Sequence, residues 1–305
     1  MPRFDPSLKR TTVRSIFSGL QALSPGLAAE LASVAMFRTT RGRAAAWEAE
    51  VSARGERLWV EGPTGRLAVQ RWGQGPLVVL VHGWNGRASQ LSGFVQPLVD
   101  AGYQVVSFDA PGHGASAGHR SSMLDFARAF DVVVDSVRPF FQPLAGIIAH
   151  SMGGAAVTLA LSRAGQGARS VESNLGEPRL VFIAPPIDVR DFVVTVSSEL
   201  GLSEAARHAL ERVVEKRTGE RIDDLHAVPL ARTMTAPLLI IHDEQDRAVP
   251  VACGATLAEA WPGAELARTQ GLGHNRILRA PPAIARAVAF VRGPALRPAS
   301  PSPSA

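Results

Sequence analysis

The stretch from Gly146 to Gly165, GIIAHSMGGAAVTLALSRAG, most constrains what this chain can fold into. It reads as a short apolar strand, an abrupt turn at Ser151 and a helix of small and apolar residues. Gly153 and Gly154 remove side chains where the helix passes close to the strand it leaves. The first N–H groups of a helix are unpaired and favour negative charge, so a hydroxyl beside them is placed to attack a carbonyl. The alternative is a serine at an ordinary strand–helix junction.

Composition limits the classes of protein that this chain can be. With 305 residues, 46% of them apolar, it can bury the core of an α/β domain with an insertion, or of two domains. The net charge of +5 comes from scattered arginines, which argues against a nucleic-acid-binding face. Cys253 is the single cysteine, so no disulfide framework and no thiolate metal site are expected. Without an 18-residue apolar run or a signal peptide, we expect a cytoplasmic protein that needs no metal or cofactor.

From about residue 55, short apolar segments alternate with helical patterns. The first two segments are joined by the turn PTG, which predicts an antiparallel hairpin. The later ones are unbroken apolar runs, typical of strands buried on both faces of a parallel sheet. Together they predict an α/β fold, a doubly wound and mostly parallel sheet of about eight strands, with sites at the carboxyl ends of the strands. The expected strands are residues 56–62, 65–73, 76–84, 103–109, 146–150, 179–186, 237–246 and 264–269.

The two ends of the chain differ from this alternating region. Residues 1–54 predict an N-terminal helical segment of short helices, broken at Ser24-Pro25-Gly26. Either these helices pack on the main domain, or the basic segment 1–50 makes a weak peripheral contact with an anionic membrane. We expect packing. Residues 293–305 are rich in Pro, Ser and Ala and predict a disordered tail. The apolar positions of the two helices are Val13, Ile16, Phe17 and Leu20, followed by Leu27, Leu31 and Val34.

Residues 188–233 interrupt the main domain, which spans residues 55–292, because they contain no strand pattern. They predict two helices separated at Gly201-Leu202-Ser203, with Leu210, Val213 and Val214 on an apolar face. A helical insertion between two strands of such a sheet would lie over their carboxyl ends as a small lid. The alternative is that the helices only flank the sheet.

A nucleophilic serine needs a base and a carboxylate that orients the base. His274 lies in a glycine-flanked loop between the expected last strand and the last helix, at the carboxyl edge of the sheet. Asp246 lies where the buried strand PLLIIHDEQD ends, whereas Asp243 and Glu244 are interpreted as structural or solvated. The candidates therefore follow the chain order Ser151, Asp246, His274. For each of the eight histidines a structural role is the alternative.

Two backbone N–H groups are needed to stabilise an oxyanion. One is expected from Met152, directly after the serine, and the other from Trp84 in the loop HGWNG. Gly83 and Gly86 would let that loop fold close to Ser151. Arg87, just beyond the loop, could hold a carboxylate or phosphate of the substrate, or form a surface salt bridge.

The motifs of this chain resemble those of the α/β-hydrolase family over roughly residues 55–292. The pentapeptide around Ser151 matches the family's G-x-S-x-G except at Ala149, and Asp243 stands where a glycine often follows the strand. The resemblance implies a catalytic triad of Ser151, Asp246 and His274, with Trp84 and Met152 donating to the oxyanion. The form Ser-Met-Gly-Gly is similar to esterases, lysophospholipases and monoacylglycerol lipases. The motifs, in the family's order, are HGW (82–84), FDAPGHGAS (108–116), AHSMGG (149–154), HDEQDRAVP (242–250) and GLGH (271–274).

Three functions remain open at this point. The first is a serine hydrolase that cleaves small-molecule carboxylic esters through an acyl-enzyme on Ser151. The apolar residues Phe192, Val193, Val196 and Leu200 of the insertion suggest a substrate with an apolar part. The second is an acyltransferase, lactonase or carbon–carbon hydrolase that uses the same residues. The third is a non-catalytic binding module on the same fold.

Overall fold

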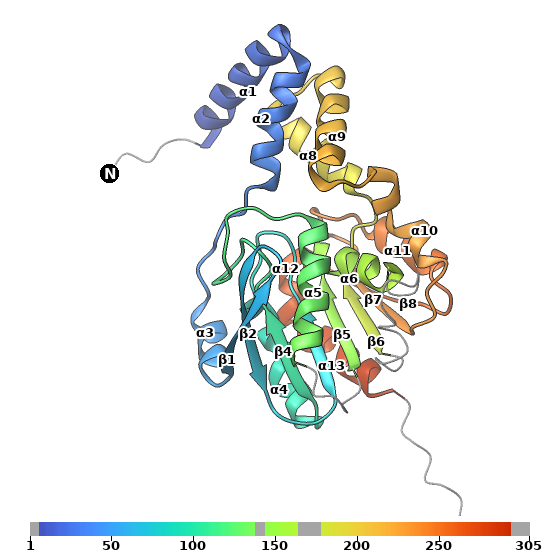
Figure 1. Cartoon of the computed structure of the whole chain (residues 1–305). Helices are drawn as coiled ribbons and strands as arrows, with labels where there is room; N and C mark the ends of the chain where they lie inside the picture. The colour runs from blue at the N-terminus through green and yellow to red at the C-terminus, as the bar shows by residue number, and fades with distance from the viewer. Residues whose placement is uncertain (1–5, 138–143, 164–177, 294–305) are drawn as a thin grey trace, which may run out of the picture.

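An eight-stranded sheet runs through the described residues in the order β1-β2-β4-β3-β5-β6-β7-β8 (Figure 1). The structure is a computed structural model and describes residues 6–137, 144–163 and 178–293. Strands β1, β2 and β4 pair antiparallel, and β3 to β8 pair parallel, which confirms the predicted fold class. The strands are β1 (Glu56–Gly62), β2 (Gly65–Trp72), β3 (Leu77–Val81), β4 (Gln104–Phe108), β5 (Leu144–His150), β6 (Arg179–Ile183), β7 (Leu238–Asp243) and β8 (Glu265–Thr269).

Two hydrophobic cores cover the two faces of this sheet. Successive residues of a strand point to opposite faces. Val79 and Val81 of β3 accordingly belong to one core, and Val78 and Leu80 to the other. Every residue of β3, β4 and β7 is buried, as the unbroken apolar runs predict.

The helices that supply these cores come from the segments between the strands. One core is completed by α5 (Met123–Val137), α6 (Met152–Arg163), α10 (Ala227–Ala231) and α11 (Val251–Ala260). The other is completed mainly by η1 (Ala88–Leu91), α4 (Ser92–Asp100), η4 (Ile277–Arg279) and α13 (Pro281–Arg292). The short helices α3 (Ala46–Ala53) and α12 (Gly273–Arg276) precede β1 and η4.

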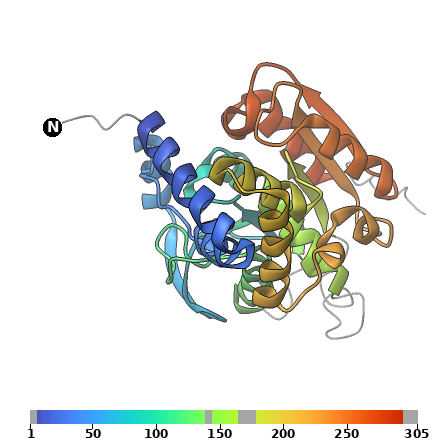
Figure 2. The same cartoon turned by 90° about the horizontal axis from the view of Figure 1, so that it is seen from above.

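A third hydrophobic core lies outside the sheet domain, in a group of helices that we call the helical cap (Figures 1 and 2). The cap consists of α1 (Pro6–Leu23), α2 (Pro25–Phe37), α8 (Val189–Leu200), α9 (Glu204–Thr218) and η3 (Ile222–Leu225). The first pair of helices, α1 and α2, is called the N-terminal hairpin. The break in the second pair, α8 and α9, lies where the sequence predicts it: Gly201 adopts φ 71°, and the Ser203 side chain caps α9.

The N-terminal helices pack on the main domain, as expected, through α8 and α9 of its insertion. The apolar face expected to be buried is wrong in part, because α2 buries its alanines Ala28, Ala29 and Ala32. Of the large apolar residues, Phe17 is buried, but Ile16 is 55% and Leu31 45% exposed. Alanines let two helix backbones approach closely, so the face of small side chains became the interface. The predicted disordered tail lies, after Gly293, outside the described residues.

Candidate active site

Ser151 stands at the sharp turn between β5 and α6. Its φ of 52° is unusual for a residue with a side chain, and its N–H donates to the carbonyl of Ile183 at 2.8 Å. Gly153 permits the turn, because a Cβ there would lie 2.6 Å from the carbonyl oxygen of His82. The serine is therefore held at the N-terminus of α6, where the N–H groups of the first turn lack intrahelical partners.

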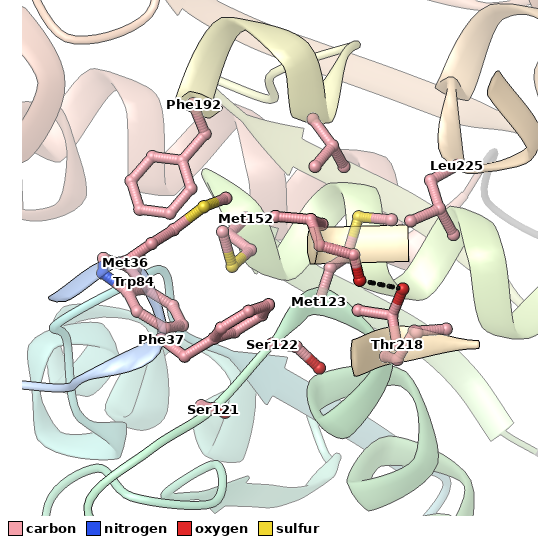
Figure 3. Close-up of a pocket in the computed structure, with 13 residues that line it drawn as sticks. Met36, Phe37, Trp84, Ser121, Ser122, Met123, Met152, Phe192, Thr218 and Leu225 are labelled. Carbon is pink, nitrogen blue, oxygen red and sulfur yellow. Dashed lines mark hydrogen bonds between the residues drawn. The ribbon is translucent and has the colours of Figure 1, made fainter. Parts of the chain in front are cut away.

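The loop after β3 passes directly beside this serine. A Cβ on Gly83 would lie 2.9 Å from the Cβ of Ser151, so only glycine fits without displacing the loop. Trp84 follows in this loop and Met152 opens α6, and both line one pocket (Figure 3). The two residues that carry the predicted N–H donors therefore line the same pocket.

Two buried histidines connect the loop after β3 to the loop after β4. His82 Nε2 accepts the N–H of Ala110 at 3.0 Å, and His113 Nε2 accepts the N–H of Asn85 at 3.0 Å. Each ring donates through Nδ1 to a carbonyl, that of Gly83 for His82 and that of Pro111 for His113. Burial lowers the pKa of each ring to about 4, so both are neutral at pH 7 and can accept at Nε2. The sequence marked both motifs but did not show this pairing.

Asp246 and His274 form the hydrogen bond expected of a carboxylate and a catalytic base. The distance from His274 Nδ1 to Asp246 Oδ2 is 2.7 Å, and the Asp246 side chain is fully buried. Burial alone would raise the pKa of Asp246, but hydrogen bonds from His274 and from the N–H groups of Val249 and Ala248 hold it below its ordinary value. An ionised Asp246 accepts from Nδ1–H and leaves Nε2 of His274 free to take a proton.

Two further residues fix the loop that carries His274: Asp243, which the sequence interpreted as structural or solvated, and His150, whose role the sequence did not identify. Asp243 Oδ2 accepts the N–H of Leu272 at 2.9 Å and the hydroxyl of Thr269 at 2.8 Å. His150 is buried, and its Nε2–H donates to the carbonyl of His274 at 2.9 Å. The His150 and His274 rings have centroids 4.6 Å apart. Since His150 directly precedes Ser151, this contact ties the histidine loop to the turn at the serine.

Arg87 is held by a carboxylate of the protein. Its guanidinium donates to both oxygens of Glu48 in α3, at 2.8 and 2.9 Å, and the two side chains are only 16% and 8% exposed. The Ser89 hydroxyl also donates to Glu48, at 2.8 Å. The substrate contact considered for Arg87 is therefore not supported, and the salt bridge is more buried than the surface pair expected.

Residues 38–48, which we call the strap, lie along the loop after β3 and the loop after β4. The N–H of Thr40 donates to Asn85 Oδ1 at 2.8 Å, next to Trp84. Arg41 donates to the carbonyls of Gly112, Ser116 and Gly118. With Glu48 on Arg87, the strap contacts the loop after β3 on both sides of Gly86.

An apolar pocket begins at Trp84 and Met152 and extends between the sheet domain and the helical cap (Figure 3). The Phe192 ring from α8 meets the Trp84 ring edge to face, with centroids 5.7 Å apart. Met36 and Phe37 of α2 form another wall, so the N-terminal hairpin completes the pocket. None of the described residues that line it carries a charge.

The described residues offer neither a metal site nor a membrane-spanning helix. No cluster of three or more His, Cys, Asp or Glu side chains is arranged to hold a metal ion. No described helix is both long and apolar enough to cross a membrane.

Comparison with known proteins finds one matching family model and several relatives of similar sequence. The family model described as serine aminopeptidase, S33, matches residues 75–222. The chain is 30% identical over 237 residues to a 2-hydroxy-6-oxononadienedioate/2-hydroxy-6-oxononatrienedioate hydrolase of Dechloromonas aromatica, covering 65% of this chain and 80% of that protein. It is 27% identical to the non-heme chloroperoxidase CPO-A1 of Kitasatospora aureofaciens, covering 67% of this chain and 86% of that protein.

The solved structures agree on the fold. An esterase from Exiguobacterium antarcticum superposes with a TM-score of 0.58 at 15% identity, over 78% of this chain and all of that one. The sheet order, the serine at the turn between β5 and α6, and these relatives lead to one conclusion. The chain belongs to the α/β-hydrolase family of serine hydrolases.

Proposed function

We propose that this hydrolase cleaves carboxylic esters through an acyl-enzyme on Ser151, with His274 as base and Asp246 as its orienting carboxylate. The observation that carries the proposal is the 2.7 Å bond from His274 Nδ1 to the buried Asp246, in a loop tied to the serine turn through His150. This bond selects the tautomer in which Nε2 can accept the serine proton.

The reaction follows from these positions. Ser151 Oγ attacks the ester carbonyl while His274 Nε2 takes its proton, and the N–H groups of Met152 and Trp84 stabilise the oxyanion. His274 then returns the proton to the departing alcohol. Water, deprotonated by the same nitrogen, attacks the acyl-enzyme and releases the acid.

The substrate that fits the pocket has an apolar acyl or alkyl part. The pocket is lined mainly by methionine, phenylalanine, leucine and valine side chains. Burying a charge there without a partner would be unfavourable, and Arg87 is already paired with Glu48.

Replacing Ser151 with alanine tests the proposal. Members of a triad act as a unit, so we expect kcat for p-nitrophenyl butanoate to fall by about 10⁶-fold where chemistry limits the rate. A fluorophosphonate probe should label the wild type at Ser151 and leave Ser151→Ala unlabelled. Residual activity within tenfold of the wild type, in protein free of contaminating esterases, would refute the assignment.

A carbon–carbon hydrolase is the second candidate, favoured by the relative from Dechloromonas aromatica. The substrate in that relative's name is a dicarboxylate, whereas the described lining of this pocket offers no cation. We therefore favour esters. Product analysis on the two substrate types, with and without added alcohols, also separates ester hydrolysis from lactonase and acyltransferase activity. Absence of any labelling at Ser151 would favour a binding module.

A further inference from the structure

His242, the penultimate residue of β7, is a buried histidine with no part in the reaction proposed for Ser151. Its Nε2–H donates to the carbonyl of Val249 at 2.9 Å, so Nδ1 carries a bare lone pair. That nitrogen has no hydrogen-bond partner within the described residues. A Cβ on Gly254 would lie 2.4 Å from it, so the backbone of α11 packs directly against the ring. A buried acceptor without a partner lowers stability, and residues that break this rule concentrate at functional sites.

The ring of His242 is bonded to the turn that carries Asp246. Asp246 Oδ1 accepts the N–H groups of Ala248 and Val249 at 2.8 and 3.0 Å, and the carbonyl of Val249 accepts from His242. His242 Nε2 also lies 3.6 Å from Asp246 Oδ2, the oxygen that accepts Nδ1–H of His274. This distance is too long for a hydrogen bond, but it places a polar N–H beside a buried carboxylate, where electrostatic interactions are strong.

Two successive residues of β7 therefore support the two ends of the bond between Asp246 and His274. Asp243 accepts the N–H of Leu272, in the loop that carries His274. His242 points to the opposite face of the strand and is bonded to the turn that carries Asp246. Because β7 is buried and pairs with both β6 and β8, its end is a rigid support for both partners.

We propose that His242 is a positioning residue, which holds the carboxylate of Asp246 where it can fix the imidazole of His274. This rests on the proposed function, in which His274 is the base. Burial lowers the pKa of His242, so its ring is neutral at pH 7 and supplies a hydrogen bond and not a charge. The groups whose charges act on this ring are Asp243, Asp246 and His274.

Two substitutions of His242 test the proposal. His242→Leu removes the N–H donor, whereas His242→Gln keeps one on a side chain of similar reach. With p-nitrophenyl butanoate, His242→Leu should lower kcat by about ten- to a hundredfold at little change in KM, and His242→Gln should recover most of the loss. In His242→Leu the acid limb of kcat/KM should also move to lower pH, because an imidazole with a displaced carboxylate holds its proton less strongly.

Ile240→Ala is the matched control. Ile240 lies two residues earlier in β7, is fully buried and packs against the same glycine, since a Cβ on Gly254 would lie 3.2 Å from its Cγ2. It carries no polar group that reaches Asp246. Ile240→Ala should therefore lower the melting temperature but leave kcat and the pH profile as in the wild type.

Proton NMR supplies a readout that needs no turnover. In Ser151→Ala protein, the His274 Nδ1 proton in its 2.7 Å bond to Asp246 should give a far-downfield signal. The signal should move or vanish when His242→Leu is added and persist when Ile240→Ala is added. Gly254→Ala, which keeps the imidazole but displaces it, should act like His242→Leu and replaces it if that variant does not fold.

An unchanged signal and an unchanged acid limb in folded His242→Leu would overturn the inference, as would equal losses of kcat in His242→Leu and Ile240→Ala. If Ser151→Ala alone retains esterase activity, the proposed function fails. The NMR comparison still decides whether His242 positions Asp246.

Discussion

At the scale of single residues, two aspartates three positions apart have different partners. Asp246 accepts a hydrogen bond from the imidazole of His274, whereas Asp243 accepts one from the backbone of the loop that carries His274.

Asp246→Asn should lower kcat by about 10⁴-fold, because the imidazole loses the carboxylate that fixes its tautomer. Asp243→Asn should lower kcat far less and mainly reduce the melting temperature. For both variants, kcat is measured with p-nitrophenyl butanoate and the melting temperature by calorimetry. If Asp243→Asn lowers kcat more than Asp246→Asn does, the wrong carboxylate was assigned.

The buried neutral histidines predict how stability depends on pH. Burial lowers the pKa of His82 and His113 to about 4 and that of His150 to about 3. Between pH 6.5 and about 4 the unfolded chain therefore binds more protons than the folded one. The stability that these residues contribute is complete above pH 6.5 and is lost as pH falls toward 4.

We expect the free energy of unfolding to fall by roughly 3–4 kcal/mol between pH 6 and pH 5, about 1.4 kcal/mol per histidine and pH unit at most. Urea titrations at the two pH values measure it. His113→Gln should reduce this difference by roughly a quarter to a third, since it removes one of the four histidines whose pKa burial lowers, His242 being the fourth. A pH-independent free energy over this range would contradict the neutral assignment.

At the scale of elements, the strap connects α3 and the N-terminal hairpin to the loop that carries Trp84. Its Glu48 is buried with Arg87, so Glu48→Ala leaves a cation without its partner. We expect a loss of about 3–5 kcal/mol in the free energy of unfolding. We also expect kcat to fall more than KM changes, because the loop that carries Trp84, the proposed oxyanion donor, is displaced.

Glu61→Ala is the matched control for that variant. Glu61 and Arg66 are 4.0 Å apart with side chains 83% and 56% exposed, so their removal should change stability by less than about 1 kcal/mol. Equal effects of the two substitutions on stability and kcat would show that the strap does not position the loop.

At the scale of the whole molecule, the helical cap is built from segments that are distant in the sequence. Ala32 of α2 is fully buried in the core that α2 shares with α8 and α9, while its neighbour Leu31 is 45% exposed. Ala32→Glu should lower the melting temperature and reduce activity on long-chain esters more than on acetate, because Met36 and Phe37 lose their position. Leu31→Glu should change neither.

Leu31→Glu also tests the membrane contact, which stays a proposal. Leu23, Leu27 and Leu31 are exposed on the N-terminal hairpin at 84%, 49% and 45%. If they touch an anionic membrane, co-sedimentation with anionic vesicles should weaken with salt and with Leu31→Glu at an unchanged melting temperature. Absence of vesicle binding in the wild type would end that proposal.

The sequence by itself determined the alternating strands and helices, the turn at Ser151, and the places of Asp246 and His274 at the carboxyl edge of the sheet. These features depend on local periodicity, on glycine where the backbone turns, and on the rule that parallel strands end at one edge. The same reasoning located Gly201 and Ser203 between two cap helices.

Only the tertiary structure decided which surfaces meet. Arg87 pairs with a glutamate 39 positions away, and His113 accepts from an N–H 28 positions away. The hairpin buries alanines because close backbone approach, and not side-chain size, sets its interface with α9. The pocket arises from the same docking. Such contacts depend on the relative placement of whole elements, and the local pattern of one segment carries no information about its distant partner.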